Sequence, residues 1–61
     1  YMGEGVIDFK SLTEAVAATG WRGDIECEIF NQAVWDTPFD QVAAKVADSF
    51  DKEVAPYWPV R

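Results

Sequence analysis

The predicted fold depends on one stretch of the sequence, Asp24-Ile25-Glu26-Cys27-Glu28-Ile29-Phe30. Its apolar and polar residues alternate, and a period of two is typical of a β-strand. The odd-numbered residues form an apolar face, whereas the even-numbered residues form an acidic face that ends with a phenylalanine. Helical patterns precede and follow this stretch. We therefore predict a strand between two helices, which is typical of a parallel α/β sheet.

The segment before this strand is predicted to be a helix that begins after Asp8 and ends at Gly20. Aspartate is a preferred N-cap, and glycine readily adopts the left-handed conformation that ends a helix. Residues at spacings of three and four form its apolar face: Phe9, Leu12, Ala15 and Val16. The other positions are predicted to face outward: Lys10, Thr13, Glu14 and Ala17.

A second helix is predicted after the strand, with Thr37 as its N-cap and Pro38 at its first position. Asp40 lies three residues after this cap, where a carboxylate bonds back to the backbone. One apolar stripe continues along the helix: Phe39, Val42, Ala43, Val46, Ala47, Phe50 and Val54. The helix should end before Pro56, because proline disfavours a helical conformation at the preceding residue. Residues 57–61 are predicted to be an extended tail.

The composition limits the classes of partner. The chain has 61 residues and a net charge of −6, from 11 acidic and 5 basic residues. This balance disfavours nucleic acids and anionic membrane surfaces, which bind clustered lysine and arginine. No apolar run is long enough to span a bilayer. The hydrophobic fraction of 49% indicates a folded core, yet a chain this short buries only about 60% of its surface. We therefore expect a piece of a larger domain.

The chain has a single cysteine, Cys27, on the apolar face of the predicted strand. A single cysteine forms no internal disulfide, so we expect a buried, reduced thiol and a cytoplasmic protein. A catalytic cysteine is disfavoured, because the sequence contains no histidine to activate it.

Glu28 is the leading candidate for a functional residue. It lies at the carboxyl end of the predicted strand, and barrel enzymes place their chemistry at that end. A carboxylate there ligates a divalent cation through oxygen. The alternative is a half-exposed antiparallel strand whose acidic face is simply hydrated. Glu26 lies two residues earlier on the same face, and we interpret it as a structural carboxylate rather than as a partner of the metal.

Two further groups of residues are weaker candidates. Gly3 and Gly5 could cradle a phosphate, but a plain turn is the favoured interpretation. Phe30, Asn31 and Trp35 could line the mouth of a pocket, because the loop after a strand lies on the catalytic side of such a fold. Their alternative role is to pack the loop onto its own helix, and we favour this role for Trp35.

Several short motifs occur in an order that resembles a known family. The order is Gly3-Glu4-Gly5-Val6-Ile7-Asp8-Phe9, a helix, Gly20-Trp21-Arg22-Gly23, and then Ile25-Glu26-Cys27-Glu28-Ile29-Phe30. It resembles the C-terminal part of the sugar phosphate isomerase/epimerase family, which are xylose isomerase-like TIM barrels related to endonuclease IV. The similarity continues through Asn31, Trp35 and Pro38. Trp21 departs mildly from the tyrosine or phenylalanine that is more frequent in this family.

This resemblance implies a fold and an activity. Residues 1–61 would be the C-terminal fragment of a TIM (β/α)8 barrel, with the last strand and its flanking helices. The activity would be isomerisation or epimerisation of a sugar or sugar phosphate by proton transfer next to a carbonyl. The resemblance disfavours nuclease activity, because the nuclease members need many histidines. The remainder of the barrel would be the main partner, and homo-oligomers are left open.

The resemblance also implies a cofactor. Members of the family bind a divalent metal, often Mn, Mg, Co or Zn, through two glutamates, an aspartate and a histidine. Glu28 matches the glutamate of the last strand, so the resemblance makes it both a metal ligand and the catalytic residue that moves the proton. The other ligands have no counterpart in these 61 residues, so the chain is expected to be inactive alone. The alternative is a small acidic α/β protein-interaction module without catalysis.

Overall fold

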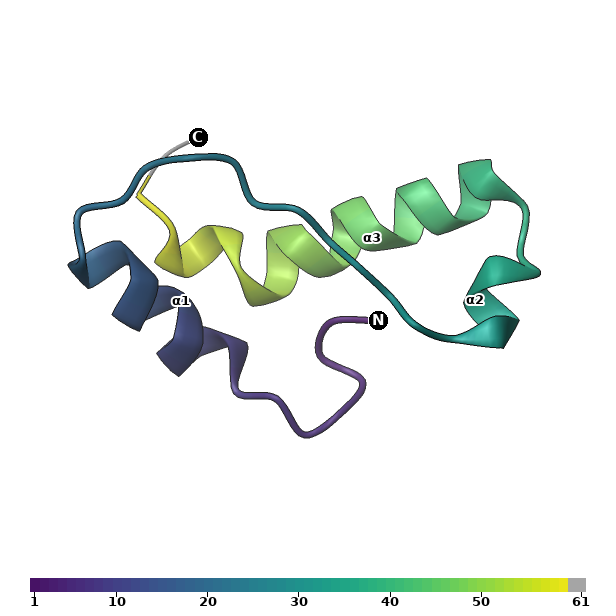
Figure 1. Cartoon of the computed structure of the whole chain (residues 1–61), viewed down its shortest axis with the longest axis horizontal. Coiled ribbons are helices and arrows are strands. Elements are labelled where there is room, and N and C mark those ends of the chain that lie inside the picture. Colours follow the sequence, from purple (N-terminus) through teal and green to yellow (C-terminus); the bar gives the residue numbers. More distant parts are fainter. Residues whose placement is uncertain (60–61) are drawn as a thin grey trace.

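The computed structural model describes residues 1–59, and its regular elements are helices (Figure 1). In chain order they are α1 (Phe9–Ala18), α2 (Gln32–Trp35), α3 (Phe39–Glu53) and the short 3-10 helix η1 (Ala55–Tyr57). α1 lies beside η1 and the C-terminal end of α3, whereas α2 lies at the far end of the molecule. The molecule measures 36 × 23 × 16 Å.

The predicted strand is absent from the described residues. Residues 21–30 run as an extended segment back along α3 (Figure 1), and they form no backbone–backbone hydrogen bond with any other described residue. A β-strand exists only when a neighbouring strand supplies such bonds, and residues 1–59 contain no second extended segment paired with this one. The predicted α/β class is therefore wrong, and the chain is not a C-terminal fragment of a TIM barrel.

The predicted ends of the first helix are confirmed. The Asp8 carboxylate accepts hydrogen bonds from the Ser11 amide at 3.1 Å and the Ser11 hydroxyl at 2.7 Å. α1 ends at Ala18, and Gly20 follows with a φ of 86°, in the left-handed region that glycine tolerates best.

The Asp8 cap predicts a dependence of α1 on pH. The hydrogen bonds from the Ser11 hydroxyl and amide hold the pKa of Asp8 below its usual value. Because the pKa of Asp8 is lower in the folded state, its ionised carboxylate stabilises the helix above the unfolded pKa of about 3.9. This stabilisation is lost as the pH falls through the folded pKa. We therefore expect NMR to show α1 fraying below about pH 4. Asp8→Asn is the control, because asparagine caps without titrating; equal fraying in both proteins would contradict the prediction.

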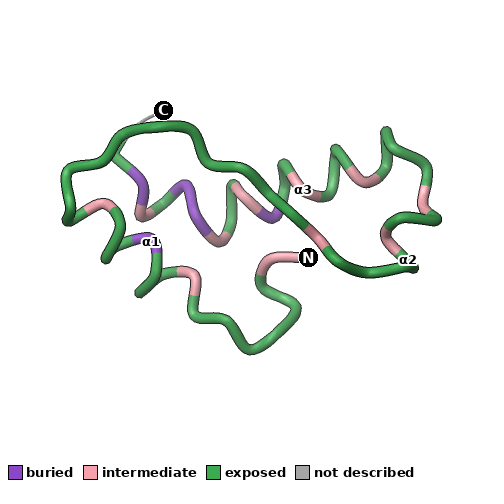
Figure 2. Tube along the Cα trace, viewed as in Figure 1, coloured by how far each residue is buried: buried purple, intermediate pink, exposed green. Residues whose placement is uncertain are grey.

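The buried residues form a small cluster where α1 meets η1 and the C-terminal end of α3 (Figure 2). They are Thr13, Ser49, Val54, Ala55 and Trp58. The predicted orientation of α1 is partly wrong, because Thr13 is only 7% exposed and Leu12 is 54% exposed. The tail prediction also fails in part, since the chain turns through η1 and buries the Trp58 side chain. Residues 60–61 of the predicted tail lie outside the described residues.

α3 confirms the predicted second helix, but its N-terminus differs from the prediction. The helix begins at Phe39 after Pro38, and no side chain caps it. The Thr37 hydroxyl instead donates to the Ala33 carbonyl oxygen at 2.7 Å. The reason is the short helix α2, which lies in the segment predicted as a loop and ends just before Thr37.

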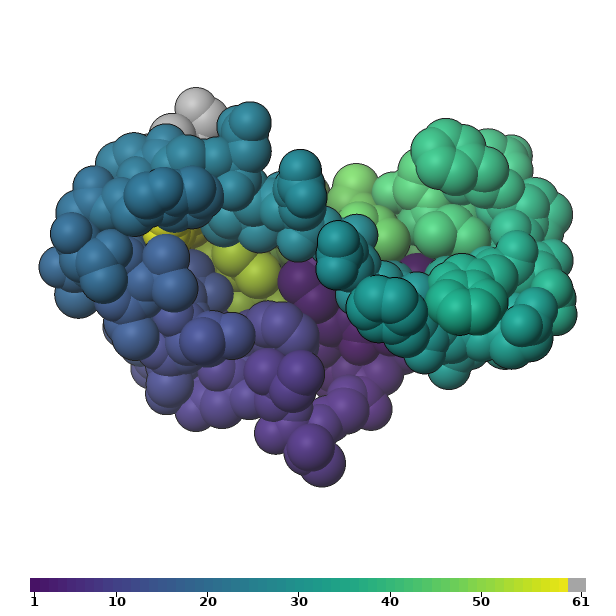
Figure 3. Space-filling model, viewed as in Figure 1, coloured from purple at the N-terminus to yellow at the C-terminus, as the bar shows by residue number. Residues whose placement is uncertain are grey.

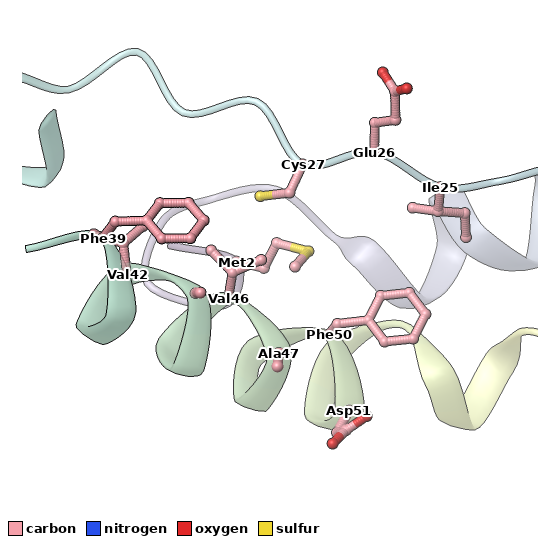
Figure 4. Close-up of a pocket in the computed structure, with 11 residues that line it drawn as sticks. Met2, Ile25, Glu26, Cys27, Phe39, Val42, Val46, Ala47, Phe50 and Asp51 are labelled. Carbon is pink, nitrogen blue, oxygen red and sulfur yellow. The ribbon is translucent and has the colours of Figure 1, made fainter.

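The N-terminal turn, residues 1–5, is held against α3 by contacts with the Lys45 ammonium. The Glu4 carboxylate lies 3.2 Å from the Lys45 ammonium of α3. The Lys45 ammonium also lies 4.4 Å from the centroid of the Tyr1 ring. These contacts place Met2 in the space between α3 and the extended segment (Figure 4).

Among residues 1–59, none of the helices combines the length and the apolar character that crossing a membrane requires.

Candidate functional site

Glu28 is exposed in the extended segment 21–30. It lies along a groove of about 380 Å³, whose other side consists of the N-terminal turn and the start of α1. No described residue forms a hydrogen bond or an ion pair with its carboxylate. Both oxygens are therefore hydrated and accessible to a ligand.

A second, larger groove runs between the extended segment and α3, with a volume of about 610 Å³. Figure 4 shows the Ile25 and Cys27 side chains on the side of the segment that faces α3, whereas the Glu26 carboxylate points away from it. The alternation of apolar and acidic faces, which the sequence predicted, is therefore present around these residues although the strand is not.

The floor of this second groove is the predicted stripe of α3. The groove is lined by residues spaced three and four apart along the helix: Phe39, Val42, Ala43, Val46, Ala47 and Phe50. Val42, Val46 and Phe50 are half-buried, but Phe39 is 83% exposed. The stripe thus faces the rest of the chain without being covered by it.

Cys27 differs from its prediction. Its thiol is free and exposed at the edge of the groove, whereas the sequence predicted a buried thiol. The physical reason is the missing neighbour: a side chain on the apolar face of a strand is buried only when another layer packs against it.

The loop residues pack locally. The indole N–H of Trp35 donates to the Ile29 carbonyl oxygen at 2.8 Å, and the Phe30 and Trp35 rings meet edge to face at 6.5 Å. The Asn31 side chain accepts hydrogen bonds from the amides of Ala33 and Val34 and caps α2. The predicted packing of the loop onto its own helix is therefore confirmed for Trp35, whereas Phe30 also lines the groove of Glu28. This capping role of Asn31 was not predicted from the sequence, although asparagine is a preferred N-cap.

A third groove, of about 230 Å³, lies between α1 and the extended segment. Figure 3 shows this hollow, with the C-terminal part of α3 at its base. Phe9, Leu12 and Val16 line it together with the buried Trp58. The predicted apolar face of α1 thus borders this groove, and Leu12 stays exposed because none of the described residues closes the groove.

The described residues do not form a metal site by themselves. Within residues 1–59, the structure brings no three His, Cys, Asp or Glu side chains close enough to hold one ion. Glu28 is the one residue that the resemblance assigned as a ligand, and the structure leaves it without a second ligand beside it. A metal bound through Glu28 would need further ligands from solvent or from another polypeptide segment, because residues 1–59 gather no such group around it.

Large apolar side chains are exposed over much of the surface. Those with the greatest exposure are Val6, Ile7, Leu12, Trp21, Phe30, Trp35 and Phe39. Burying one such side chain contributes about 1.5–3 kcal/mol. The burial free energy that is lost by leaving all of them in water is therefore similar to the free energy of unfolding of a whole small domain, roughly 5–15 kcal/mol. The described residues therefore leave a large part of their apolar surface in contact with water.

No protein-family model, curated protein or solved structure matches the chain.

Proposed function

We propose that this chain is one component of a divalent-metal-dependent sugar or sugar-phosphate isomerase or epimerase, inactive alone. The observation that carries this proposal is the Glu28 carboxylate, which is exposed beside a groove and has no partner among the described residues. Glu28 is also the residue that matches the family's metal-binding glutamate. The described residues contain no strand, so the proposal rests on this carboxylate and on the sequence match, and not on a position at the end of a barrel strand.

In this proposal, Glu28 contributes one oxygen ligand and moves a proton at the carbon next to the substrate carbonyl. The remaining ligands, whether the metal is Mn, Mg, Co or Zn, come from other residues of the enzyme. The exposed apolar side chains support this division, because they supply a surface on which the rest of the enzyme packs. We place the protein in the cytoplasm, where a single exposed thiol such as Cys27 stays reduced.

Calorimetric titration with Mn²⁺ and Mg²⁺ tests the proposal, beside turnover on a panel of ketoses and their phosphates. The experiment uses both the 61-residue chain and the complete natural polypeptide that contains it. We expect metal binding and turnover in the complete polypeptide and neither in the 61-residue chain. A complete polypeptide without metal binding and without turnover would overturn the proposal.

The second candidate function is a small acidic protein-interaction module without catalysis. The exposed apolar side chains favour it directly, since monomeric proteins rarely leave large apolar patches in water. This function requires a partner protein but no metal. The titration above therefore separates the two candidates.

A further inference from the structure

The backbone of residues 24–28 is extended and unpaired. Residues 21–30 take part in no backbone–backbone hydrogen bond with another described residue, and within 24–28 no side chain of the described residues bonds to the backbone either. The segment is exposed throughout residues 24–28. An exposed, extended backbone with free N–H and C=O groups is a template for pairing with another strand.

The side chains of this segment already have the arrangement of a paired strand. Ile25 and Cys27 face α3, and Glu26 points away from it (Figure 4). A partner strand that adds along the backbone would leave this packing unchanged, because its hydrogen bonds lie in the plane between the two faces. In such strand addition, main-chain bonds supply affinity and alternate side chains supply specificity.

The negative charge of residues 24–28 favours a partner strand with basic side chains. Asp24, Glu26 and Glu28 alternate along it, and the whole chain carries a net charge of −6. Pairing with the same segment of a second copy, in the register that keeps both apolar faces on one side, would set carboxylates against carboxylates. Like charges directly opposite each other destabilise a strand pair. A partner strand with lysine or arginine at alternate positions would instead form cross-strand pairs of opposite charge.

We propose that residues 24–28 dock by strand addition onto the exposed sheet edge of a partner protein whose edge strand carries alternate basic residues. The docking depends on the backbone and charge of this segment, so it stands whether or not Glu28 takes part in catalysis.

The test uses a defined probe, a seven-residue capped peptide of alternating lysine and valine. Every second residue of the probe is N-methylated, so that only one of its edges forms hydrogen bonds. We expect titration of the ¹⁵N-labelled chain to shift the amides of residues 24–28 and to slow their hydrogen exchange. The amides of α1 and α3 should shift little. A peptide with glutamate in place of lysine should bind at least tenfold more weakly, and the difference should shrink at high salt because salt screens exposed charges.

Proline variants test the backbone itself. Successive amides of a strand point to opposite edges, so Glu26→Pro blocks one edge and Cys27→Pro the other. Neither proline removes a hydrogen bond within the described structure, and circular dichroism would verify that the helices persist. Glu26→Gln and Cys27→Ala are the matched controls. We expect one proline variant to bind the lysine peptide at least tenfold more weakly than its control.

Two results would overturn the proposal. In the first, both proline variants bind as tightly as their controls, which excludes main-chain pairing. In the second, the glutamate peptide binds as tightly as the lysine peptide, which excludes a basic edge strand as the partner.

Discussion

Under the proposed function, replacing Glu28 with glutamine is expected to abolish most of the turnover of the complete protein. Glutamine keeps the shape of the side chain but removes the charge that binds a cation and the oxygen that accepts a proton. Loss of a positioned proton-transfer group lowers turnover about 10²–10⁴-fold. The fold should survive, because the Glu28 side chain is exposed and bonds to no described residue. The measurements are kcat on sugar phosphates, metal affinity by calorimetry and helicity by circular dichroism.

Glu26→Gln is the matched control for this substitution. It removes the same charge two residues away, from a side chain that points away from the groove along α3 (Figure 4). We expect it to lower turnover far less than Glu28→Gln. Equal losses in the two variants would mean that the net charge of the segment, rather than the Glu28 carboxylate, supports the activity.

Replacing Trp58 with alanine is expected to have the largest effect on the stability of the chain. Trp58 is only 6% exposed, and its ring lies 6.1 Å from the Trp21 ring and 5.9 Å from the Arg22 guanidinium. Truncation of a buried tryptophan costs about 3–5 kcal/mol. This loss approaches the entire stability of a small domain, so α1 should separate from η1. Near-ultraviolet circular dichroism and helicity at low temperature would report the loss.

Trp35→Ala is the control, because this tryptophan is 59% exposed. It contacts Phe30 and the Ile29 carbonyl, both within its own loop. We expect a cost of about 1 kcal/mol or less, typical of a surface site with one hydrogen bond. A similar loss of helicity in both variants would show that the buried cluster around Trp58 does not hold the helices together.

The sequence by itself determined the features that depend on near neighbours in the chain. Asp8 and Gly20 mark the ends of α1, because a cap and a left-handed glycine act within one turn of the helix. The apolar stripe of α3 follows from spacing along one helix, and the groove residues confirm it. The alternation in residues 25–27 is likewise local, since successive side chains of an extended backbone point to opposite sides.

Only the tertiary structure decided what surrounds these elements. Residues 24–30 alternate like a strand, but a strand also needs a neighbour, and no described segment of this chain supplies one. Whether Cys27 is exposed and Thr13 is buried depends on which element packs against each side chain. The periodicity of the sequence does not specify that element. The candidate site around Glu28 also divides into a part that the sequence determines and a part that only the tertiary structure decides. The sequence singled out Glu28, whereas only the structure shows that no two other acidic or cysteine side chains among residues 1–59 gather with it into a possible metal site, because that depends on how distant parts of the chain are placed in space.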